Sequence, residues 1–224
     1  MNALQKELRL DRQPRHIECF DNSNLQGAHP VASCVVFRDG KPARKEYRHF
    51  NIKTVEGPDD YASMREVVFR RYSRLQEEGA ELPDLIIADG GKGQMGIIHE
   101  VLEYLGLDIP VAGLAKNDRH RTSELLCGYP PVLVGIRPTS PLFHFLAHIQ
   151  EEVHRFAVSF HRQKRSKAFI HSELEQIEGV GDKTVQTLLR HFRTVEKVRA
   201  ANIEELSALV GAAKAKKIRA FFEK

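Results

Sequence analysis

Cysteine is scarce in this sequence, and its three residues stand far apart. Cys19, Cys34 and Cys127 show no paired spacing, which excludes the spaced-cysteine patterns of zinc ribbons and dithiol redox sites. Scattered cysteines are typical of proteins kept in a reducing compartment, so we expect a cytoplasmic protein.

Other features are also missing. No stretch approaches the roughly 18 consecutive apolar residues of a membrane-spanning helix, and no signal peptide is expected. The phosphate-loop pattern Gly-x4-Gly-Lys-Ser/Thr is absent, which leaves a nucleotide-binding enzyme as a distant alternative. The net charge is only +4, from 34 Lys and Arg against 30 Asp and Glu. This balance permits nucleic-acid binding without requiring it.

The apolar and turn-forming segments predict an α/β domain in the first part of the chain. Strands are expected at 15–20, 31–37 and 45–52 as an antiparallel meander, at 85–88 and 111–115, and as a hairpin or irregular segment at 125–136. Helices are expected after a cap at Asp59 or Asp60, at about 94–105, and from about 140 after a polar loop at 116–124. The order implies a mixed sheet flanked by helices, as in the ribonuclease H-like fold.

Two carboxylates follow predicted strands. Asp89 ends the buried strand Leu85 to Ala88 and opens a glycine-rich turn, although a lone Asp-Gly is more often only a turn. Asp21 follows the first strand of the predicted meander. Taken alone, Asp89 needs partner residues before it indicates a functional site.

The long helix from about residue 140 adds a histidine. His154 falls on the flank of its apolar stripe, from which a side chain can reach a cleft beside the core. The more common role of such a histidine is a partly buried side chain with a satisfied hydrogen bond. A basic run, 161–167, follows and is typical of a linker or helix end with phosphate affinity.

Residues 172–224 hold an internal repeat without a convincing strand. Leu174-x-x-Ile177-x-Gly179-Val180-Gly181 matches Leu206-x-x-Leu209-x-Gly211-Ala212-Ala213 at an offset of 32 residues. This pattern predicts a doubled helix-hairpin-helix, in which backbone N–H groups at helix N-termini cradle phosphates without reading bases. The alternative is an αα-hairpin used only for packing. Ala213 replaces the second glycine, so weaker phosphate contact is expected there.

Several stretches carry a resemblance as an ordered set. They are Glu18-Cys19-Phe20-Asp21-Asn22-Ser23, Phe50-Asn51-Ile52, Asp59-Asp60-Tyr61-Ala62-Ser63-Met64, Arg70-Arg71-Tyr72, Asp89-Gly90-Gly91-Lys92-Gly93-Gln94 and Glu152-Val153-His154-Arg155-Phe156-Ala157 with His161-Arg162. Together with the doubled hairpin they resemble the C-terminal half of the UvrC family, the nuclease subunits of bacterial UvrABC nucleotide excision repair. The likeness covers nearly the whole chain.

The resemblance implies a metal-dependent DNA endonuclease that makes the 5′ incision near a lesion. It implies Asp21, Asp89 and His154 as catalytic triad and ligands of Mg²⁺ or Mn²⁺, with His154 as nitrogen ligand or proton-transfer group. On neighbouring strands, roughly 5 Å apart, the two aspartates could converge on one hard divalent cation, which prefers carboxylate oxygen. Asp60 matches another acid associated with the activity, although it could simply cap its helix. DNA contacts are expected at Lys92, Arg162, Lys164, Arg165, Gly179, Gly181, Lys183, Gly211, Lys214 and Lys216.

The resemblance also sets the expected domains and partners. We expect a ribonuclease H-like domain at 12–162, a basic linker at 163–171 and a small all-α tandem helix-hairpin-helix domain at 172–224. The expected partners are damaged double-stranded DNA and UvrB, with UvrA acting earlier. The family's other nuclease domain and its UvrB-binding hairpin are missing, so we expect a fragment, monomeric in solution. The rival hypotheses are another ribonuclease H-like nuclease, such as a junction resolvase, and a DNA-binding scaffold without catalysis.

Overall fold

The computed structural model describes residues 1–23, 31–55, 57, 59–116 and 122–223, with the backbone alone for 23, 116, 122–123 and 161–172. The chain divides into two compact units, Met1–Phe160 and His161–Lys224, here called the sheet unit and the helical unit. No helix in the described ranges has the length and apolar character needed to cross a membrane.

The sheet unit is built on one mixed sheet in the order β3-β2-β1-β5-β6-β7-β8, with β4 also paired to β2. Its strands are β1 (His16–Ser23), β2 (Val31–Arg38), β3 (Lys41–Pro42), β4 (Arg48–Asn51), β5 (Leu85–Ala88), β6 (Val111–Lys116), β7 (Thr122–Cys127) and β8 (Val132–Val134). β5 is parallel to both β1 and β6, whereas the outer pairings are antiparallel. The predicted mixed sheet is thereby confirmed.

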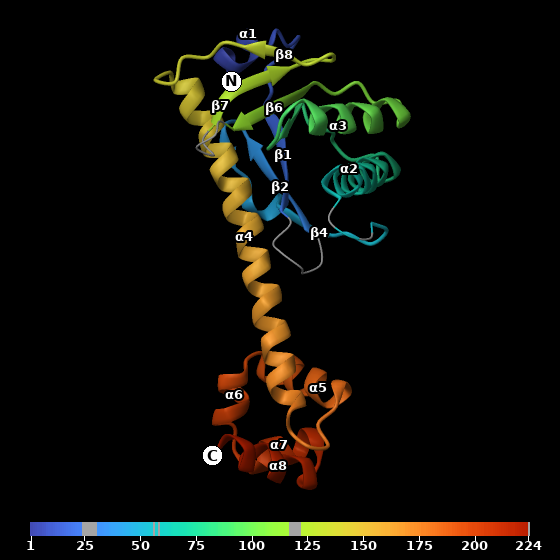
Figure 1. Cartoon of the computed structure of the whole chain (residues 1–224), viewed down its shortest axis with the longest axis vertical. Helices are drawn as coiled ribbons and strands as arrows, with labels where there is room; N and C mark the ends of the chain where they lie inside the picture. The colour runs from blue at the N-terminus through green and yellow to red at the C-terminus, as the bar shows by residue number, and fades with distance from the viewer. Residues whose placement is uncertain (24–30, 56, 58, 117–121, 224) are drawn as a thin grey trace. The chain divides into compact units, whose positions relative to one another are not determined.

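Helices cover both faces of this sheet (Figure 1). α2 (Asp60–Glu77) and α3 (Lys92–Tyr104) lie on one face, and the N-terminal part of α4 (Pro141–Glu175) lies on the other. A short helix, α1 (Asn2–Leu8), precedes β1. The core between these layers is apolar because β5, with sequence Leu-Ile-Ile-Ala, is buried at every position.

Three predicted segments differ in detail from the structure. Within 45–52, only Arg48–Asn51 is a strand, since Arg44–Glu46 forms a 3₁₀ turn that follows the short β3. The predicted loop at 116–124 ends in strand β7, while residues 117–121 lie outside the described ranges. β1 extends to Ser23, so Asp21 lies within a strand and is held by its ladder.

Up to residue 223, the helical unit contains the C-terminal end of α4 and four shorter helices. These are α5 (Asp182–Phe192), α6 (Val195–Ala200), α7 (Ile203–Val210) and α8 (Ala212–Phe222). The repeat becomes two helix-turn-helix pairs, α4 with α5 and α7 with α8. Gly179 and Gly211 have φ values of +83° and +84° in these turns, a backbone conformation that favours glycine.

Candidate functional site

The carboxyl ends of two adjacent parallel strands form the centre of the candidate site. β1 pairs with β5 through Phe20 and Ala88, so Asp21 and Asp89 stand one residue beyond this pair on neighbouring strands. The Asp89 N–H donates to the Phe20 carbonyl at 2.8 Å, which continues the ladder into the turn. Both aspartates are buried, at 7% and 6% exposure. The structure thus brings the two predicted carboxylates together at one edge of the sheet.

α4 places a polar side chain over each of these strand ends. Nδ1 of His154 lies 3.7 Å from Oδ2 of Asp21, and the imidazole is 62% exposed. One turn earlier, the buried Gln150 amide donates from Nε2 to Oδ1 of Asp89 and, at 3.3 Å, to the carbonyl of Leu114. The predicted His154 therefore joins the site, and Gln150 is a residue that the sequence analysis missed.

The N-terminus of α2 brings Asp60 beside this group. The cap of α2 is Asp59, whose Oδ1 accepts from the Ala62 N–H at 2.9 Å, so Asp60 is not the capping residue. Asn22, next to Asp21 on β1, donates through its amide to the Asp60 carbonyl at 2.7 Å. Partial burial and the negative charges of Asp59 and Asp21 raise the pKa of Asp60. The Asn22 bond holds the start of α2 next to the strand that carries Asp21.

The glycine-rich turn after Asp89 is shaped by close packing. A Cβ at Gly90 would meet the end of the flexible Gln94 side chain. A Cβ at Gly93 would lie 2.5 Å from the Tyr61 hydroxyl, so glycine lets α3 approach α2 here. Lys92 is exposed as the first residue of α3, three positions after Asp89. Its contact with a phosphate remains a prediction.

The donor set fits a hard divalent cation. Oδ2 of Asp21 is buried and has no hydrogen-bond partner in the described part of the chain. Such an orphaned carboxylate oxygen is costly unless it binds a cation, and oxygen is the ligand that Mg²⁺ and Mn²⁺ prefer. Within the described ranges, no three acidic, histidine or cysteine side chains are already grouped as a complete metal cage.

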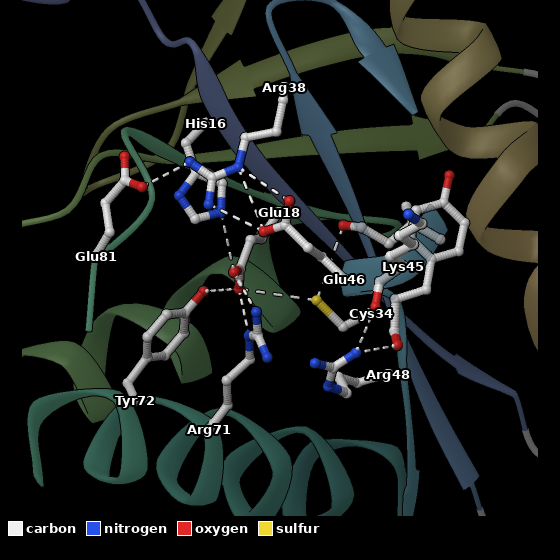
Figure 2. Close-up of polar contacts among 12 residues, drawn as sticks. His16, Glu18, Cys34, Arg38, Lys45, Glu46, Arg48, Arg71, Tyr72 and Glu81 are labelled. Atoms are coloured by element: carbon white, nitrogen blue, oxygen red, sulfur yellow. Dashed lines mark hydrogen bonds and ion pairs between the residues drawn. The ribbon is translucent and has the colours of Figure 1, made fainter. Parts of the chain in front are cut away.

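A buried ion pair between Glu18 and Arg71 fixes β1 against α2 (Figure 2). Glu18 lies three residues before Asp21 and accepts hydrogen bonds from the guanidinium of Arg71 through both of its oxygens. The Tyr72 hydroxyl donates to Glu18 at 2.9 Å, and Nε2 of His16 lies 3.3 Å from Oε1 of Glu18. The Cys34 thiol on β2 donates to Oε2 of Glu18 at 3.8 Å and completes the cluster. This network ties together the two elements that carry Asp21 and Asp60.

The charge of Glu18 is stabilised despite its burial. Burial alone raises the pKa of this carboxyl, but the Arg71 guanidinium, together with His16 and Tyr72, lowers it to about 2. Burial and the neighbouring Glu18 charge raise the pKa of Tyr72, so its hydroxyl stays protonated as a donor. The sequence analysis used Glu18 and Arg71 only as parts of motifs and did not predict that they pair.

The predicted phosphate contacts of the helical unit lie at the two hairpin turns. Gly181 is the N-cap of α5 and Gly211 the N-cap of α8, so each precedes a helix N-terminus. Lys183 and Lys216 are exposed near these termini. Lys214 instead donates to the Thr184 hydroxyl at 3.0 Å and so links the two hairpins. Arg162, Lys164 and Arg165 lie on α4 where only the backbone is described.

Comparison with known families agrees with this architecture. Residues 5–158 match the model of the UvrC RNase H endonuclease domain, and residues 172–224 match a SAM-like helix-hairpin-helix tandem. The chain belongs to the UvrC RNase H endonuclease domain family. The ribonuclease H-like fold and the following helix-hairpin-helix domain are thereby confirmed.

The relatives are proteins named UvrABC system protein C. The one from Bacteroides fragilis is 58% identical over 219 residues, which are 98% of this chain and 36% of that protein. The one from Streptococcus uberis is 56% identical over 210 residues, 93% of this chain and 35% of the relative. The chain thus spans about a third of the length of the curated relatives it matches.

Among solved structures, a DNA complex of Ciona intestinalis endonuclease V aligns with a TM-score of 0.36 and 16% identity, over 52% of this chain and 56% of that chain. A structural likeness at this level supports no conclusion about the function of this chain. The domain limits 12–162, 163–171 and 172–224 remain predictions. Residues 163–171 lie inside the continuous helix α4.

Proposed function

We propose that this chain is the part of a UvrC-type excision nuclease that hydrolyses a DNA phosphodiester on the 5′ side of a lesion. The observation that carries the proposal is the pair of buried carboxylates, Asp21 and Asp89, at the ends of adjacent parallel strands. Two such carboxylates repel each other unless a cation lies between them. Membership of an endonuclease domain family supports the same conclusion.

Asp21 and Asp89 would hold the cation, Mg²⁺ or Mn²⁺, with His154 beside them. A divalent ion bound there supplies charge stabilisation at the phosphoryl centre and a more acidic bound water. The imidazole of His154 is exposed and 3.7 Å from Asp21, so it can turn toward the cation as a ligand or exchange a proton with solvent. Asp60 adds negative charge at the rim, and Lys92 offers an ammonium group for a neighbouring phosphate.

The helical unit is proposed to hold the DNA backbone. The N-termini of α5 and α8 follow glycine turns, and the first N–H groups of a helix have no acceptor within the helix, which is the arrangement that binds phosphate. Lys183 and Lys216 add exposed positive charge, while Lys214 acts through its bond to Thr184. The basic residues Arg162, Lys164 and Arg165 are proposed to contribute further phosphate contacts. Such contacts give affinity without base specificity.

The proposed substrate is damaged duplex DNA presented by UvrB in the bacterial cytoplasm. The test is nicking of a pre-nicked, lesion-containing duplex by the chain with UvrB, with and without Mg²⁺ or Mn²⁺. We expect metal-dependent cutting 5′ of the lesion, preferred over cutting of a four-way junction. Preferred junction cutting would favour a resolvase. Tight DNA binding without cutting, also after the complete partner set is supplied, would favour a scaffold and contradict the proposal.

A further inference from the structure

A buried amide lies against the candidate metal centre without being one of its predicted ligands. Gln150 is only 5% exposed, and a buried amide costs free energy unless its hydrogen bonds are satisfied. Its Nε2 lies within hydrogen-bond distance of two oxygens, Oδ1 of Asp89 and the carbonyl oxygen of Leu114. Since both are acceptors, the NH₂ side of the amide must face them, which fixes the orientation of the group.

These two bonds connect three elements around the site. Leu114 lies on β6, Asp89 follows the neighbouring strand β5, and Gln150 lies on α4. The rotation of α4 is fixed close by, because the Tyr47 hydroxyl donates to the buried Glu152 at 3.1 Å. Gln150 thus joins a rigid helix and a strand backbone to one oxygen of the Asp89 carboxylate.

The spacing of α4 matches the spacing of the strands. Gln150 and His154 are four residues apart, about 6 Å along a helix, whereas adjacent strands are about 4.8 Å apart. One helix face can therefore reach both strand ends, with Gln150 at Asp89 and His154 at Asp21.

The chemistry of an amide suits this position. A lysine or arginine there would neutralise Asp89 and weaken its attraction for a cation. A neutral N–H donor orients the carboxylate and leaves its charge in place, as the outer hydrogen-bond partners of metal ligands do. We infer that Gln150 is a positioning residue that holds the Asp89 carboxylate in the orientation needed for divalent-cation binding. The inference rests on the proposed metal site.

The test is a titration of the full 224-residue chain with Mn²⁺, in which electron paramagnetic resonance measures the Mn²⁺ that stays free. Gln150→Met keeps the approximate side-chain volume and removes the donor. We expect its Mn²⁺ affinity to fall about 10- to 100-fold, the usual effect of losing an outer partner of a metal ligand. Half-maximal cleavage should need correspondingly more metal, with KM for DNA unchanged.

The matched control is Leu146→Met, a buried apolar position one turn earlier on α4, which should leave Mn²⁺ affinity unchanged. Equal affinity of wild type and folded Gln150→Met would overturn the inference. Absence of Mn²⁺ binding by the wild-type chain would instead overturn the metal site and the proposed function with it.

A second measurement needs no substitution at Gln150. Addition of Mg²⁺ to the wild-type chain should shift the NMR signals of the Gln150 side-chain amide, and Asp89→Ala should abolish that shift. If Gln150→Met fails to fold, the shift of the Gln150 amide signals decides whether Gln150 has the positioning role. An amide signal that Mg²⁺ leaves unmoved in the wild-type chain would contradict the positioning role.

Discussion

The two units of this chain differ in what they bury. Among the described residues, every buried polar or charged side chain lies in the sheet unit, with the single exception of Thr184. These groups include the strand-end aspartates, Gln150 and the Glu18 cluster. The core of the helical unit is otherwise built from apolar side chains such as Leu174, Val185 and Ile218.

This difference follows from what each unit is proposed to do. A phosphodiester is hydrolysed only by groups held in a fixed geometry, and buried hydrogen bonds provide that geometry at a cost in desolvation. Phosphate binding needs exposed N–H groups and lysines, which a plain apolar core can support. Single changes should therefore abolish function in the sheet unit and weaken it gradually in the helical unit.

The largest effect is expected at the strand ends. Asp21→Asn or Asp89→Asn keeps the side-chain shape but removes the negative charge, and should reduce 5′ incision by more than about 100-fold, beyond the usual loss for an outer partner. DNA affinity and thermal stability should change little. The measurement is single-turnover cleavage of the lesion-containing duplex, beside a binding assay.

Asp39→Asn is the matched control, because Asp39 is an exposed acid in a turn of the same unit and lies 3.8 Å from Arg15. It should cleave at the wild-type rate. Normal cleavage by either Asp21→Asn or Asp89→Asn would show that the site has been assigned to the wrong residues.

The next largest effect is expected at the buried ion pair. Arg71→Met leaves the Glu18 charge buried without its main partner, which should cost about 3–5 kcal/mol of unfolding free energy. Hydrogen exchange of β1 amides measures this free energy in the sheet unit. Recovery in the double variant Glu18→Gln, Arg71→Met would show that the cost comes from the unpaired charge.

Arg74→Met is the control on the same helix, since Arg74 forms an exposed pair with Glu78 at 2.7 Å. Its removal should change stability by no more than about 0.5 kcal/mol. An equal loss from both arginine substitutions would contradict the role given to the buried pair.

Acid should destabilise the sheet unit through the same carboxyl group. The pKa of Glu18 is lowered from 4.5 to about 2, so its contribution is complete above pH 4.5 and is lost as pH falls toward 2. Since a pKa difference of one corresponds to about 1.4 kcal/mol, this contribution is on the order of 3 kcal/mol. Between pH 4.5 and 2, the unfolding free energy measured by hydrogen exchange of β1 amides should fall by this amount less in Glu18→Gln than in the wild type. An unchanged pH dependence would contradict the lowered pKa.

The smallest effects are expected in the helical unit. Lys183→Gln and Lys216→Gln should each weaken DNA binding modestly and reduce the slope of log affinity against log salt by about 1. Bulky replacements at Gly179 and Gly181 should also lower affinity and flatten this slope. The measurement is a salt titration of DNA binding, with Lys197→Gln on α6 as the exposed control. Equal slopes for all the variants would place the DNA elsewhere.

Local patterns in the sequence predicted most of the strands and helices in their order, because a short buried strand ending in an acid is visible in the residues themselves. The meeting of Asp21 with Asp89 was instead implied by the family resemblance, since it depends on the parallel pairing of β1 with the distant β5. The sequence did not decide whether Asp59 or Asp60 caps α2. The structure assigns the cap to Asp59, because its carboxylate accepts a hydrogen bond from the Ala62 N–H.

Long-range polar pairs could not be predicted in this way. Glu18 and Arg71 are 53 residues apart, and Gln150 and Asp89 are 61 apart, so no periodicity links them. Two predicted limits were also wrong, for opposite reasons. The start of the predicted strand 45–52 forms part of the 3₁₀ turn Arg44–Glu46, whereas the end of the predicted loop 116–124 is drawn into β7 by pairing with β6.

The most direct test of the central claim is a crystal structure of the chain grown with Mn²⁺, using anomalous scattering to locate the ion. We predict an anomalous peak about 2.0–2.2 Å from carboxylate oxygens of both Asp21 and Asp89, at the distance that small hard cations adopt. A peak elsewhere, or no peak beside two well-ordered aspartates at saturating Mn²⁺, would contradict the account.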